Sequence, residues 1–333
     1  MYQNKKILII GGTGTLGRHL VKSLLLEAPD VIRILSRDEH KQFEMQEQLR
    51  EYANIRYLIG DVRDLQRLVR SMEDVDYVFH LAAMKHVPAC EYNPFETVQT
   101  NVIGTQNVIQ AALQSGVKKV LFTSTDKAIS PTNTYGASKL MAERLISAAE
   151  FQKGSKETIF SSVRLGNVMG SRGSVIPLFK EQIFARGYIT VTDCDMSRYM
   201  MTPSQATQLM LKANSLSYGG EVFVLKMPVI RLKDLAEVVI QEVKDKYNVS
   251  ASIEIKEIGL RPGEKMFEEL MTADEARVAL ERSDMFIIPS QFSSKVNRYP
   301  DVKVGTNYCY SSKYETPISK DTLHEWIRTE ELT

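Results

Sequence analysis

A short apolar strand, followed at once by a glycine loop and a helix, is the feature that most constrains the fold of this chain. Residues 5–10 contain an apolar run rich in Ile, which is typical of a strand buried on both faces. The loop GGTGTLG follows, and residues 18–27 continue as a predicted helix. Such a loop lets the backbone approach a pyrophosphate, which the helix N-terminus attracts. We therefore expect a dinucleotide here, bound by Gly11, Thr13, Gly14, Thr15, Leu16 and Gly17.

Strand and helix patterns alternate after this unit. Short apolar runs predict strands, and the longer polar or amphipathic runs between them predict helices. This alternation is typical of an α/β fold with a doubly wound parallel sheet of the Rossmann type, which we expect over residues 1–165. The predicted strands span residues 31–35, 55–59, 76–81, 118–123 and 158–165, and the predicted helices span residues 39–52, 65–72, 94–116 and 135–149.

A smaller C-terminal α/β lobe is expected from most of residues 166–333. A glycine-rich loop at 166–173 lies beyond the end of a predicted strand, where substrate loops belong. We expect this lobe to bind the substrate, and we expect residues 200–228 to return to the first domain. Its predicted helices span residues 175–186, 204–215 and 231–247, and its short strands span residues 189–192 and 221–225.

The end of the second strand indicates which dinucleotide binds. An acidic residue there would bind the ribose 2′-hydroxyl of NAD, whereas Ser36 followed by Arg37 suits the 2′-phosphate of NADP. Asp38, one residue later, keeps NAD open, and the alternative for Arg37 is a solvated loop charge. We therefore expect NADP, with NAD less favoured. Asp61 and Val62 follow the third strand, where the adenine would lie.

Small residues at the end of the fourth strand, Ala82 and Ala83, leave room for a cofactor at the crevice of the sheet. The next loop contains Lys85 and His86, which either contact the sugar or only shape the loop. Asn101, inside the following predicted helix, is either a buried and hydrogen-bonded polar residue or part of the active site. We include Lys85 and Asn101 among the expected cofactor contacts.

The stretch FTSTDKAISPTNTYGASK contains the candidate catalytic residues. Thr125, Asp126 and Lys127 end the fifth predicted strand, and a loop separates them from Tyr135 and Lys139. Tyr135 and Lys139 are four residues apart on a helix, so they share a face. A nearby ammonium favours phenolate and lowers the tyrosine pKa, which makes Tyr135 an acceptor for an alcohol proton. A bare Tyr-x-x-x-Lys pattern is usually an ordinary helix pair, but the N-terminal dinucleotide unit reverses those odds.

Composition argues against several classes of function. The chain has 42 Lys and Arg against 41 Asp and Glu, and this balance indicates neither a nucleic-acid nor a membrane surface. Three scattered cysteines are too few for a disulfide framework or a zinc cluster, so no metal is expected. No stretch reaches the ~18 apolar residues of a membrane span. We interpret the N-terminal apolar run as a strand and not as a signal peptide, and we expect the cytoplasm as the compartment.

Taken together, the motifs resemble the extended short-chain dehydrogenase/reductase family. Within it, the chain is similar to the UDP-N-acetylglucosamine 4,6-dehydratases, and most of all to the C5-inverting type that starts pseudaminic acid synthesis. STDKA before Tyr-x-x-x-Lys is specific, because simple reductases of the family carry a plain Ser or Thr there. Tyr135 also points to this branch, since other relatives have Met at its position. The matching stretches are GGTGTLG, SRDE, AAMKHVPACEYNP, TNVIGTQNV, STDKAISPTNTYGASK, RLGNVMGSRGSVIPLF, MSRYMMT and RPGEKMFEEL.

The resemblance implies dehydration of UDP-N-acetylglucosamine with NADP. Tyr135, activated by Lys139, would take the proton of the 4-hydroxyl while C4 gives hydride to NADP⁺, and Thr125 would hydrogen-bond the 4-oxygen. Lys127, as a neutral amine with a lowered pKa, would remove the C5 proton, and protonated Asp126 would help the 6-hydroxyl leave as water. Hydride would return to C6, and C5 would be reprotonated on the opposite face. The structural alternative for Asp126 and Lys127 is a salt bridge at the strand end.

The substrate itself is expected to contact residues of the loops and of the smaller lobe. Arginine forks suit the phosphate oxygens of a nucleotide sugar, although any one arginine is as readily a surface ion pair. The candidates are Lys85, His86, Asn167, Arg172, Val175, Arg198, Arg261 and Glu264.

Two other functions stay open at this stage. A UDP-hexose 4-epimerase would share the glycine loop and the Tyr135–Lys139 pair but would not need Asp126 and Lys127. The second is a catalytically silent NADP-binding protein on the same fold. The family also implies a homo-oligomer, a dimer or a hexamer, paired through the helices predicted at 94–116 and 135–149. The residues of these helices that form either the outer face or the core are Val98, Val102, Leu140 and Ile146.

Overall fold

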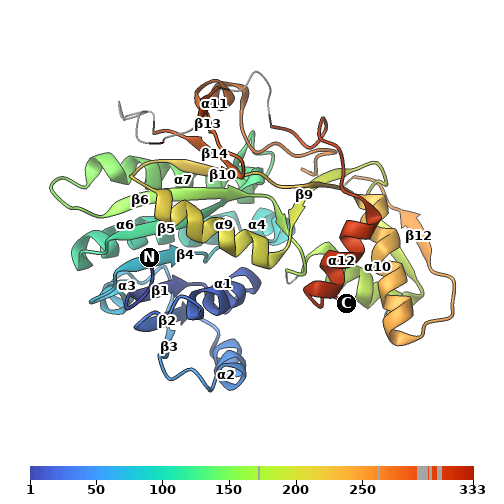
Figure 1. Cartoon of the computed structure of the whole chain (residues 1–333), viewed down its shortest axis with the longest axis horizontal. Helices are drawn as coiled ribbons and strands as arrows, with labels where there is room; N and C mark the ends of the chain where they lie inside the picture. Colours follow the sequence, from blue (N-terminus) through green and yellow to red (C-terminus); the bar gives the residue numbers. More distant parts are fainter. Residues whose placement is uncertain (172, 261–262, 291–298, 300–301, 306–309) are drawn as a thin grey trace.

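One mixed sheet of ten strands organises the part of the chain that the structure describes (Figure 1). The structure is a computed structural model, and it describes residues 1–171, 173–260, 263–290, 299, 302–305 and 310–333. The strand order is β15-β13-β14-β10-β6-β5-β4-β1-β2-β3. The strands that run parallel are β1 (Lys6–Ile10), β2 (Val31–Ser36), β3 (Ile55–Ile59), β4 (Tyr77–His80), β5 (Lys119–Thr125), β6 (Ile159–Leu165) and β10 (Val222–Leu225).

Side chains alternate along β1 and divide the apolar core between the two faces of the sheet. Ile7 and Ile9 belong to one core, and Leu8 and Ile10 belong to the other. The first core includes α1 (Thr15–Leu25), α2 (Glu39–Gln48) and α9 (Pro203–Leu216), and the second includes α3 (Leu65–Met72), α6 (Gly104–Ser115) and α7 (Thr134–Gln152). This arrangement confirms the predicted doubly wound sheet of the Rossmann type.

Segments from beyond residue 166 complete the main sheet. β10 pairs in parallel with β6, and α9 packs against α1, so residues 203–225 pack with the elements formed by residues 1–165. Beyond β10 the sheet continues with antiparallel strands. We expected these residues in the smaller lobe, but they join the main sheet because the apolar run of β14 is buried against β10. These strands are β14 (Met285–Ile288), β13 (Leu280–Glu281), which follows helix α11 (Ala273–Val278), and β15 (Lys303–Val304).

The smaller lobe has an apolar core of its own, at the right of Figure 1. Ile176 and Phe179 of one helix pack there with Leu235 and Val239 of a second and with Leu323 of the C-terminal helix. Its elements are α8 (Val175–Arg186), β8 (Tyr188–Val191), α10 (Leu232–Tyr247), β12 (Glu254–Glu257) and α12 (Lys320–Thr329). A three-stranded sheet, of β7 (Asn167–Val168), β9 (Ser197–Met201) and β11 (Val229–Arg231), lies between this lobe and the main sheet.

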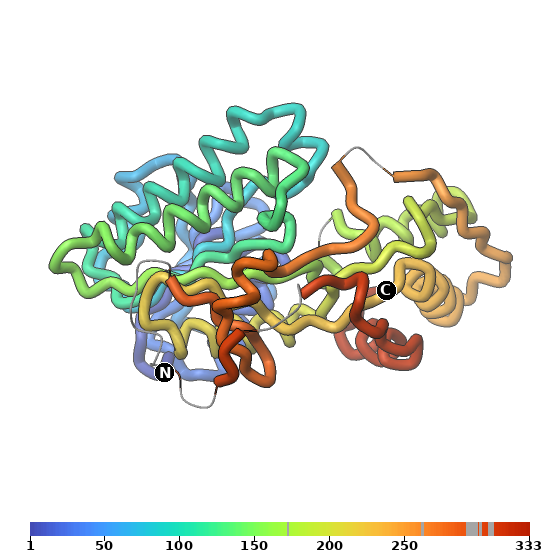
Figure 2. Tube along the Cα trace, turned by 90° about the horizontal axis from the view of Figure 1, so that it is seen from above, coloured from blue at the N-terminus to red at the C-terminus, as the bar shows by residue number. Residues whose placement is uncertain are grey.

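The chain around residues 263–272 passes from the smaller lobe back to the main sheet, as the orange segment of Figure 2 shows. It is held along its way by backbone hydrogen bonds, from Ser197 N to Met266 O at 3.1 Å and from Leu270 N to Tyr310 O at 3.0 Å. These bonds fix the position of the residues between them, and Glu268 is one of those residues.

The helix that we predicted over residues 94–116 is interrupted. α4 (Val87–Tyr92) and α5 (Pro94–Thr97) are followed by a π-helical turn, Val98–Ile103, before α6 begins. Such turns often mark functional positions, and here the turn contains Asn101. α6 ends at Gly116, whose left-handed φ of 67° is the usual helix end that glycine permits. Among the described residues, no helix has both the length and the apolar character that crossing a bilayer requires.

Candidate active site

A cavity of about 980 Å³ opens at the carboxyl ends of the parallel strands, between the main sheet and the smaller lobe. This is where ligands bind in sheets of this kind, and the volume suits a dinucleotide together with part of a second ligand. Asp61, Asn101 and Asp126 are not among the described residues that line it, and Arg172 and Arg261 lie outside the described residues. The predicted site residues that line it are Gly11, Thr13, Gly14, Thr15, Leu16, Gly17, Ser36, Arg37, Val62, Ala82, Ala83, Lys85, His86, Thr125, Lys127, Tyr135, Lys139, Asn167, Val175, Arg198 and Glu264.

The glycine loop and the first turn of α1 form one end of the cavity. α1 begins at Thr15, directly after Gly14, and the N–H groups of a first helical turn have no partner inside the helix. A Cβ at Gly17 would lie only 2.6 Å from the Cα of Gly12, so only glycine lets the helix pack this closely on the loop. Exposed backbone donors at a helix N-terminus are what a pyrophosphate needs, and these residues therefore fit a dinucleotide.

The residues expected near the ribose and adenine form a charged group at the edge of the same end of the cavity. Arg37 Nη1 lies 3.6 Å from Asp61 Oδ2, and Arg63 donates to the same oxygen from Nη2 at 2.8 Å. Asp38 serves as the N-cap of α2, because its Oδ1 accepts from the Lys41 N–H at 3.0 Å. The carboxylate of Asp38 is thus engaged in its own helix, while the side chain of Arg37 is 57% exposed.

The side-chain oxygen and nitrogen of Asn101 both form hydrogen bonds inside the protein, which agrees with the interpretation of Asn101 as a buried and hydrogen-bonded polar residue. Its Oδ1 accepts from the Met84 N–H at 2.8 Å, and its Nδ2 donates to Met84 O and to Ser138 Oγ, both at 2.9 Å. Asn101 thereby ties the loop after β4 to helix α7. We therefore assign it to positioning α7 and not to a direct cofactor contact.

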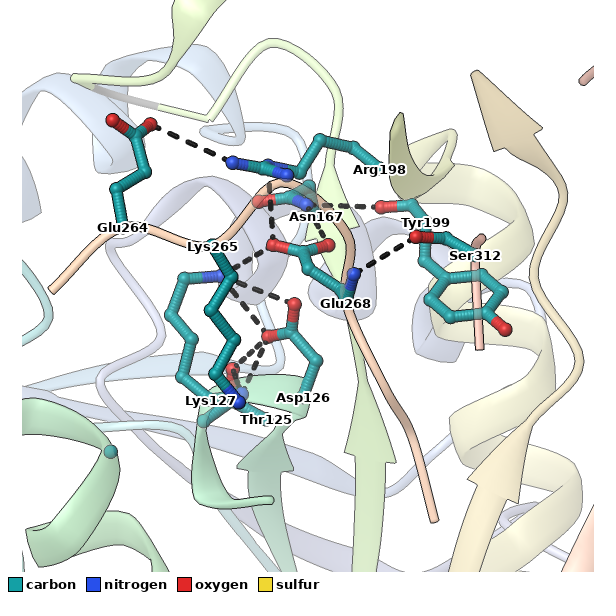
Figure 3. Close-up of polar contacts among 12 residues, drawn as sticks. Thr125, Asp126, Lys127, Asn167, Arg198, Tyr199, Glu264, Lys265, Glu268 and Ser312 are labelled. Carbon is teal, nitrogen blue, oxygen red and sulfur yellow. Dashed lines mark hydrogen bonds and ion pairs between the residues drawn. The ribbon is translucent and has the colours of Figure 1, made fainter. Parts of the chain in front are cut away.

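Thr125, Asp126 and Lys127 form a tight group where β5 ends in a short turn (Figure 3). Thr125 Oγ1 donates to Asp126 Oδ1 at 2.7 Å, and Lys127 Nζ lies 3.1 Å from the same oxygen. The Asp126 side chain is 1% exposed, whereas that of Lys127 is 32% exposed and lines the cavity. The salt bridge that we considered as an alternative is therefore present, but its cation faces the cavity.

Helix α7 starts against this turn. Asn133 Oδ1 caps it by accepting from the Gly136 N–H at 2.8 Å. A Cβ at Gly136 would lie 2.1 Å from the carbonyl oxygen of Lys127, so glycine is required for the contact. This contact holds the start of α7, which contains Tyr135, against the turn that follows β5.

We expected Lys139 to lower the pKa of Tyr135, and this expectation is wrong. Burial raises the pKa of Tyr135 to about 12, and the opposing influences come from Lys127 and the hydrogen bond with Thr125. Burial also lowers the pKa of Lys139 to about 7, against an opposite effect of Glu143. Tyr135 is therefore a phenol at neutral pH, and Lys139 is close to losing its charge.

The lowered pKa expected for Lys127 is also wrong. Burial alone would lower it, but Asp126 and Glu268 hold the pKa of this ammonium above its ordinary value. For Asp126 the effect of burial is reversed by Lys127 and by hydrogen bonds, so its pKa is lowered. The pair is thus an ammonium and a carboxylate, and each must change its protonation before it can act as base and acid.

Glu268 is the site residue that the sequence interpretation missed. Its Oε1 lies 3.2 Å from Lys127 Nζ and 3.4 Å from Arg198 Nε, and its Oε2 accepts from Asn167 Nδ2 at 2.9 Å (Figure 3). Burial and the proximity of Asp126 raise its pKa to about 7. Its position in RPGEKMFEEL was the available signal, but nothing local separates it from the adjacent Glu269.

The remaining substrate candidates surround this group. Arg198 Nη2 lies 3.6 Å from Glu264 Oε1, so the guanidinium bridges two carboxylates. Val175 is the first residue of α8, and its helix N-terminus opens toward the cavity that it lines. His86 is exposed at the rim, where its ring leaves no room for a Cβ at Gly173 of the opposite lobe.

Comparisons with known proteins agree with this geometry. A family model described as a polysaccharide biosynthesis protein matches residues 7–290. An X-ray structure of Pen from Bacillus thuringiensis has a TM-score of 0.93 and 56% sequence identity, and the match covers 100% of this chain and 99% of that one.

Three further proteins are similar in sequence to this chain over most of their own length. An uncharacterized membrane protein of Methanocaldococcus jannaschii is 52% identical over 98% of this chain and 96% of its own. A UDP-N-acetylglucosamine 4,6-dehydratase (inverting) of Campylobacter jejuni is 40% identical over 100% and 97%. A UDP-glucose 4-epimerase of Rickettsia conorii is 40% identical over 87% and 84%.

Proposed function

This chain belongs to the polysaccharide biosynthesis protein family, and from that premise we propose that it is a nucleotide-sugar 4,6-dehydratase. The substrate is UDP-N-acetylglucosamine, and the product is a UDP-4-keto-6-deoxy-N-acetylhexosamine with C5 inverted. The observation that supports this most is the Asp126–Lys127 pair, whose ammonium faces the same cavity as Tyr135 and Lys139. The inverting dehydratase of Campylobacter jejuni, matched over the whole chain, supports the same reading.

Each side chain of the pair has a distinct task in this reaction. A ketone at C4 makes the C5 proton acidic, and Lys127, once neutral, takes that proton. Asp126, once protonated, gives its proton to the 6-oxygen, so the C6–O bond breaks and water leaves. Thr125 donates a hydrogen bond to Asp126 and lines the same cavity as Tyr135, and it would hydrogen-bond the 4-oxygen of the sugar.

The first step, removal of the 4-hydroxyl proton, is assigned to Tyr135. Lys139 lies one helical turn further along the same face, and its positive charge would stabilise the phenolate as the proton leaves the sugar. A bound nicotinamide dinucleotide would supply the hydride acceptor at C4 and the hydride donor at the end. The enzyme would therefore show no net oxidation or reduction.

We propose NADP as the cofactor. Arg37 is exposed at the edge of the cavity, as a 2′-phosphate requires, and Lys41 lines the same edge. The acidic residue that could favour NAD, Asp38, accepts a hydrogen bond from its own helix and pairs with Lys41.

A 4-epimerase is the second candidate, and the Rickettsia relative supports it. Epimerisation needs oxidation at C4 and return of hydride to the same carbon, so it would use Tyr135 and Lys139 alone. The buried acid and the lysine held against it have no task in that reaction, which is why we prefer dehydration.

The experiment is product analysis by NMR after incubation of the purified protein with UDP-N-acetylglucosamine. Dehydration gives a methyl group at C6 and a keto carbon at C4, and the product absorbs in alkali. An epimer keeps its 6-hydroxyl and shows neither signal. Recovery of UDP-N-acetylgalactosamine alone would replace our proposal with the epimerase.

We further propose a homo-oligomer, a dimer or hexamer, formed through the face of α5, the π-helical turn and α7. Phe95 is 67% exposed, Val98 39% and Met141 54%, and the three elements that carry them are in contact with one another. Val102 and Leu140 are half-buried, and Ile146 is fully buried in the core. Of the four residues that we considered for the outer face, only Val98 is exposed, and Phe95 and Met141 form the rest of the apolar face.

A further inference from the structure

Glu268 joins three parts of the chain at the acid–base pair. It comes from the segment that passes from the smaller lobe to the main sheet, and it meets Lys127 after β5, Asn167 in β7 and Arg198 in β9 (Figure 3). Its side chain is 8% exposed, and Glu268 is not among the described residues that line the cavity. Any effect of Glu268 on a bound sugar therefore passes through its neighbours.

Both carboxyl oxygens of Glu268 face hydrogen-bond donors. Lys127 Nζ donates to Oε1 at 3.2 Å, and Arg198 Nε lies 3.4 Å from the same oxygen. Asn167 Nδ2 donates to Oε2 at 2.9 Å and to Tyr199 O at 3.1 Å, which fixes the orientation of the Asn167 amide. Two oxygens that both accept, one of them between two cations, are the environment of an ionised carboxylate.

The backbone of Glu268 is fixed as well. Glu268 N donates to Ser312 Oγ at 2.9 Å, and Ser312 N donates to Glu268 O at 2.9 Å. Ser312 Oγ also lies 2.9 Å from the hydroxyl of Ser197, the first residue of β9, which is followed directly by Arg198. The carboxylate therefore has a set place between the strand that carries the arginine and the turn that carries Lys127.

The proposed dehydration requires a neutral amine at Lys127 whose lone pair faces C5 of the sugar. An ionised carboxylate can only accept hydrogen bonds, so the amine donates a hydrogen to Oε1 and its lone pair faces away from Glu268. We propose that the carboxylate of Glu268 orients Lys127 as the base for C5 and balances its charge once the proton has been taken. This inference rests on the proposed dehydration, and it makes Glu268 a positioning residue because it acts through Lys127.

The charges of the step show why Lys127 needs a second carboxylate. The C5–H bond breaks and an N–H bond forms on Lys127, while the electron pair left at C5 passes to the 4-oxygen. Asp126 is neutral at this moment, because it still holds the proton for the 6-oxygen, so the charge that balances the new ammonium is that of Glu268, 3.2 Å from Nζ. The electron pair then forms the C5–C6 double bond, the C6–O bond breaks, and the 6-hydroxyl leaves with the Asp126 proton as water.

Glu268→Gln tests the inference because glutamine cannot reproduce both contacts. Its one carbonyl oxygen faces either Lys127 or Asn167, and its NH2 group then meets a donor at the other position. At pH 8, above the pKa of about 7 to which burial and Asp126 raise Glu268, the wild-type carboxylate is ionised. The variant should there exchange C5 with heavy water about 10²-fold more slowly and accumulate reduced nicotinamide, because oxidation at C4 does not pass through Glu268. Glu269→Gln should behave as wild type.

A double-mutant cycle separates this role from a merely structural one. If Glu268 acts through Lys127, adding Glu268→Gln to Lys127→Ala should change the residual C5 exchange by less than about twofold. The same 10²-fold loss in both backgrounds would overturn the inference. Glu268→Asp keeps the charge and both acceptor oxygens but is one methylene shorter, and it serves if the glutamine variant does not fold. It should slow elimination about tenfold more than oxidation, and equal losses in the two steps would overturn the inference.

A third readout needs no sugar. Lys127 is 32% exposed and lines the cavity, so acetic anhydride can reach it in the purified protein. Loss of the Glu268 charge lowers the pKa of the amine, and Lys127 in Glu268→Gln should be acetylated about tenfold faster than in wild type at pH 8. Mass spectrometry measures the ratio, with Lys265 as the internal reference. An amine that reacts faster with the reagent and yet removes the C5 proton more slowly is what misorientation predicts.

Equal acetylation of Lys127 in the wild type and in Glu268→Gln would overturn the inference. A wild-type protein that leaves UDP-N-acetylglucosamine unchanged would instead overturn the proposed function. The acetylation rates would still decide in that case whether the carboxylate of Glu268 holds Lys127.

Discussion

The ammonium of Lys139 lies 4.1 Å from the centre of the Phe122 ring, where Lys139 is only 3% exposed. The aromatic face compensates part of the lost hydration, but burial still lowers the pKa of Lys139 to about 7. Glu143, one turn further along α7, would favour the charged form, yet its Oε1 is bound by the fully buried Arg164 at 2.5 Å. Lys139 therefore changes its charge near neutral pH.

This environment predicts how Lys139→Met changes stability with pH. Between about pH 7 and the ordinary lysine pKa of about 10.4, the unfolded chain holds a proton at Lys139 that the folded chain lacks. Wild-type stability should rise with pH in this window by up to ~1.4 kcal/mol per unit from this residue. Below it both states are protonated, and the folded wild type bears the full cost of the buried charge. The advantage of the variant should thus be largest below pH 7 and shrink above it, as urea unfolding followed by circular dichroism would show; parallel curves would contradict this.

Tyr135→Phe should stop the reaction before any oxidation. Without the phenol oxygen the 4-hydroxyl proton has no acceptor, and we expect a loss of about 10²–10⁴-fold. No absorbance of reduced nicotinamide should appear when sugar is added. Tyr92→Phe is the matched control, because Tyr92 is 88% exposed and does not line the described cavity. An active Tyr135→Phe enzyme would return this tyrosine to a structural role.

Lys127→Ala should separate elimination from oxidation. In heavy water the wild type should place deuterium at C5 of the product, whereas the variant should exchange C5 about 10²–10⁴-fold more slowly and accumulate reduced nicotinamide. Lys265, whose Nζ donates to Ile129 O at 3.2 Å in the same region, supplies the control Lys265→Ala (Figure 3). If Lys127→Ala forms the keto sugar at nearly the wild-type rate, Lys127 is not the base. The Asp126–Lys127 pair would then have only the structural role of a salt bridge.

Arg37→Ala should weaken NADP binding more than NAD binding. A charge-assisted hydrogen bond to the 2′-phosphate contributes about 1.5–3 kcal/mol, which is about 10–150-fold in Kd. Titration calorimetry with both dinucleotides measures the ratio. Arg50→Ala, at an exposed arginine just beyond α2, should leave both affinities unchanged. Equal losses for NADP and NAD in Arg37→Ala would remove the phosphate contact.

Phe95→Asp should dissociate the proposed oligomer. A carboxylate on the apolar face of α5 would have to be buried without a partner when two copies pair. Light scattering at micromolar concentration should give a smaller particle than for wild type. Phe43→Asp carries the same change on α2, where Phe43 is 60% exposed, and should leave the particle size unaltered. A wild-type monomer would end the proposal.

The sequence by itself determined the features that depend on neighbours a few residues apart. Ile-rich β1, the glycine loop and α1 follow from local patterns, and so does the shared face of Tyr135 and Lys139. The alternation of strands and helices then predicted the doubly wound sheet, because few ways exist to pack such elements.

Only the tertiary structure decided which charges meet in the site. Lys127 and Glu268 are 141 residues apart, and no local pattern connects them. The pKa values of Tyr135, Lys139 and Lys127 were misjudged from spacing for the same reason, since burial and distant partners decide them. The antiparallel strand β14 likewise joined the main sheet through apolar burial against β10. Periodicity acts over one or two turns, whereas desolvation and ion pairing depend on whatever the whole fold brings within a few ångströms.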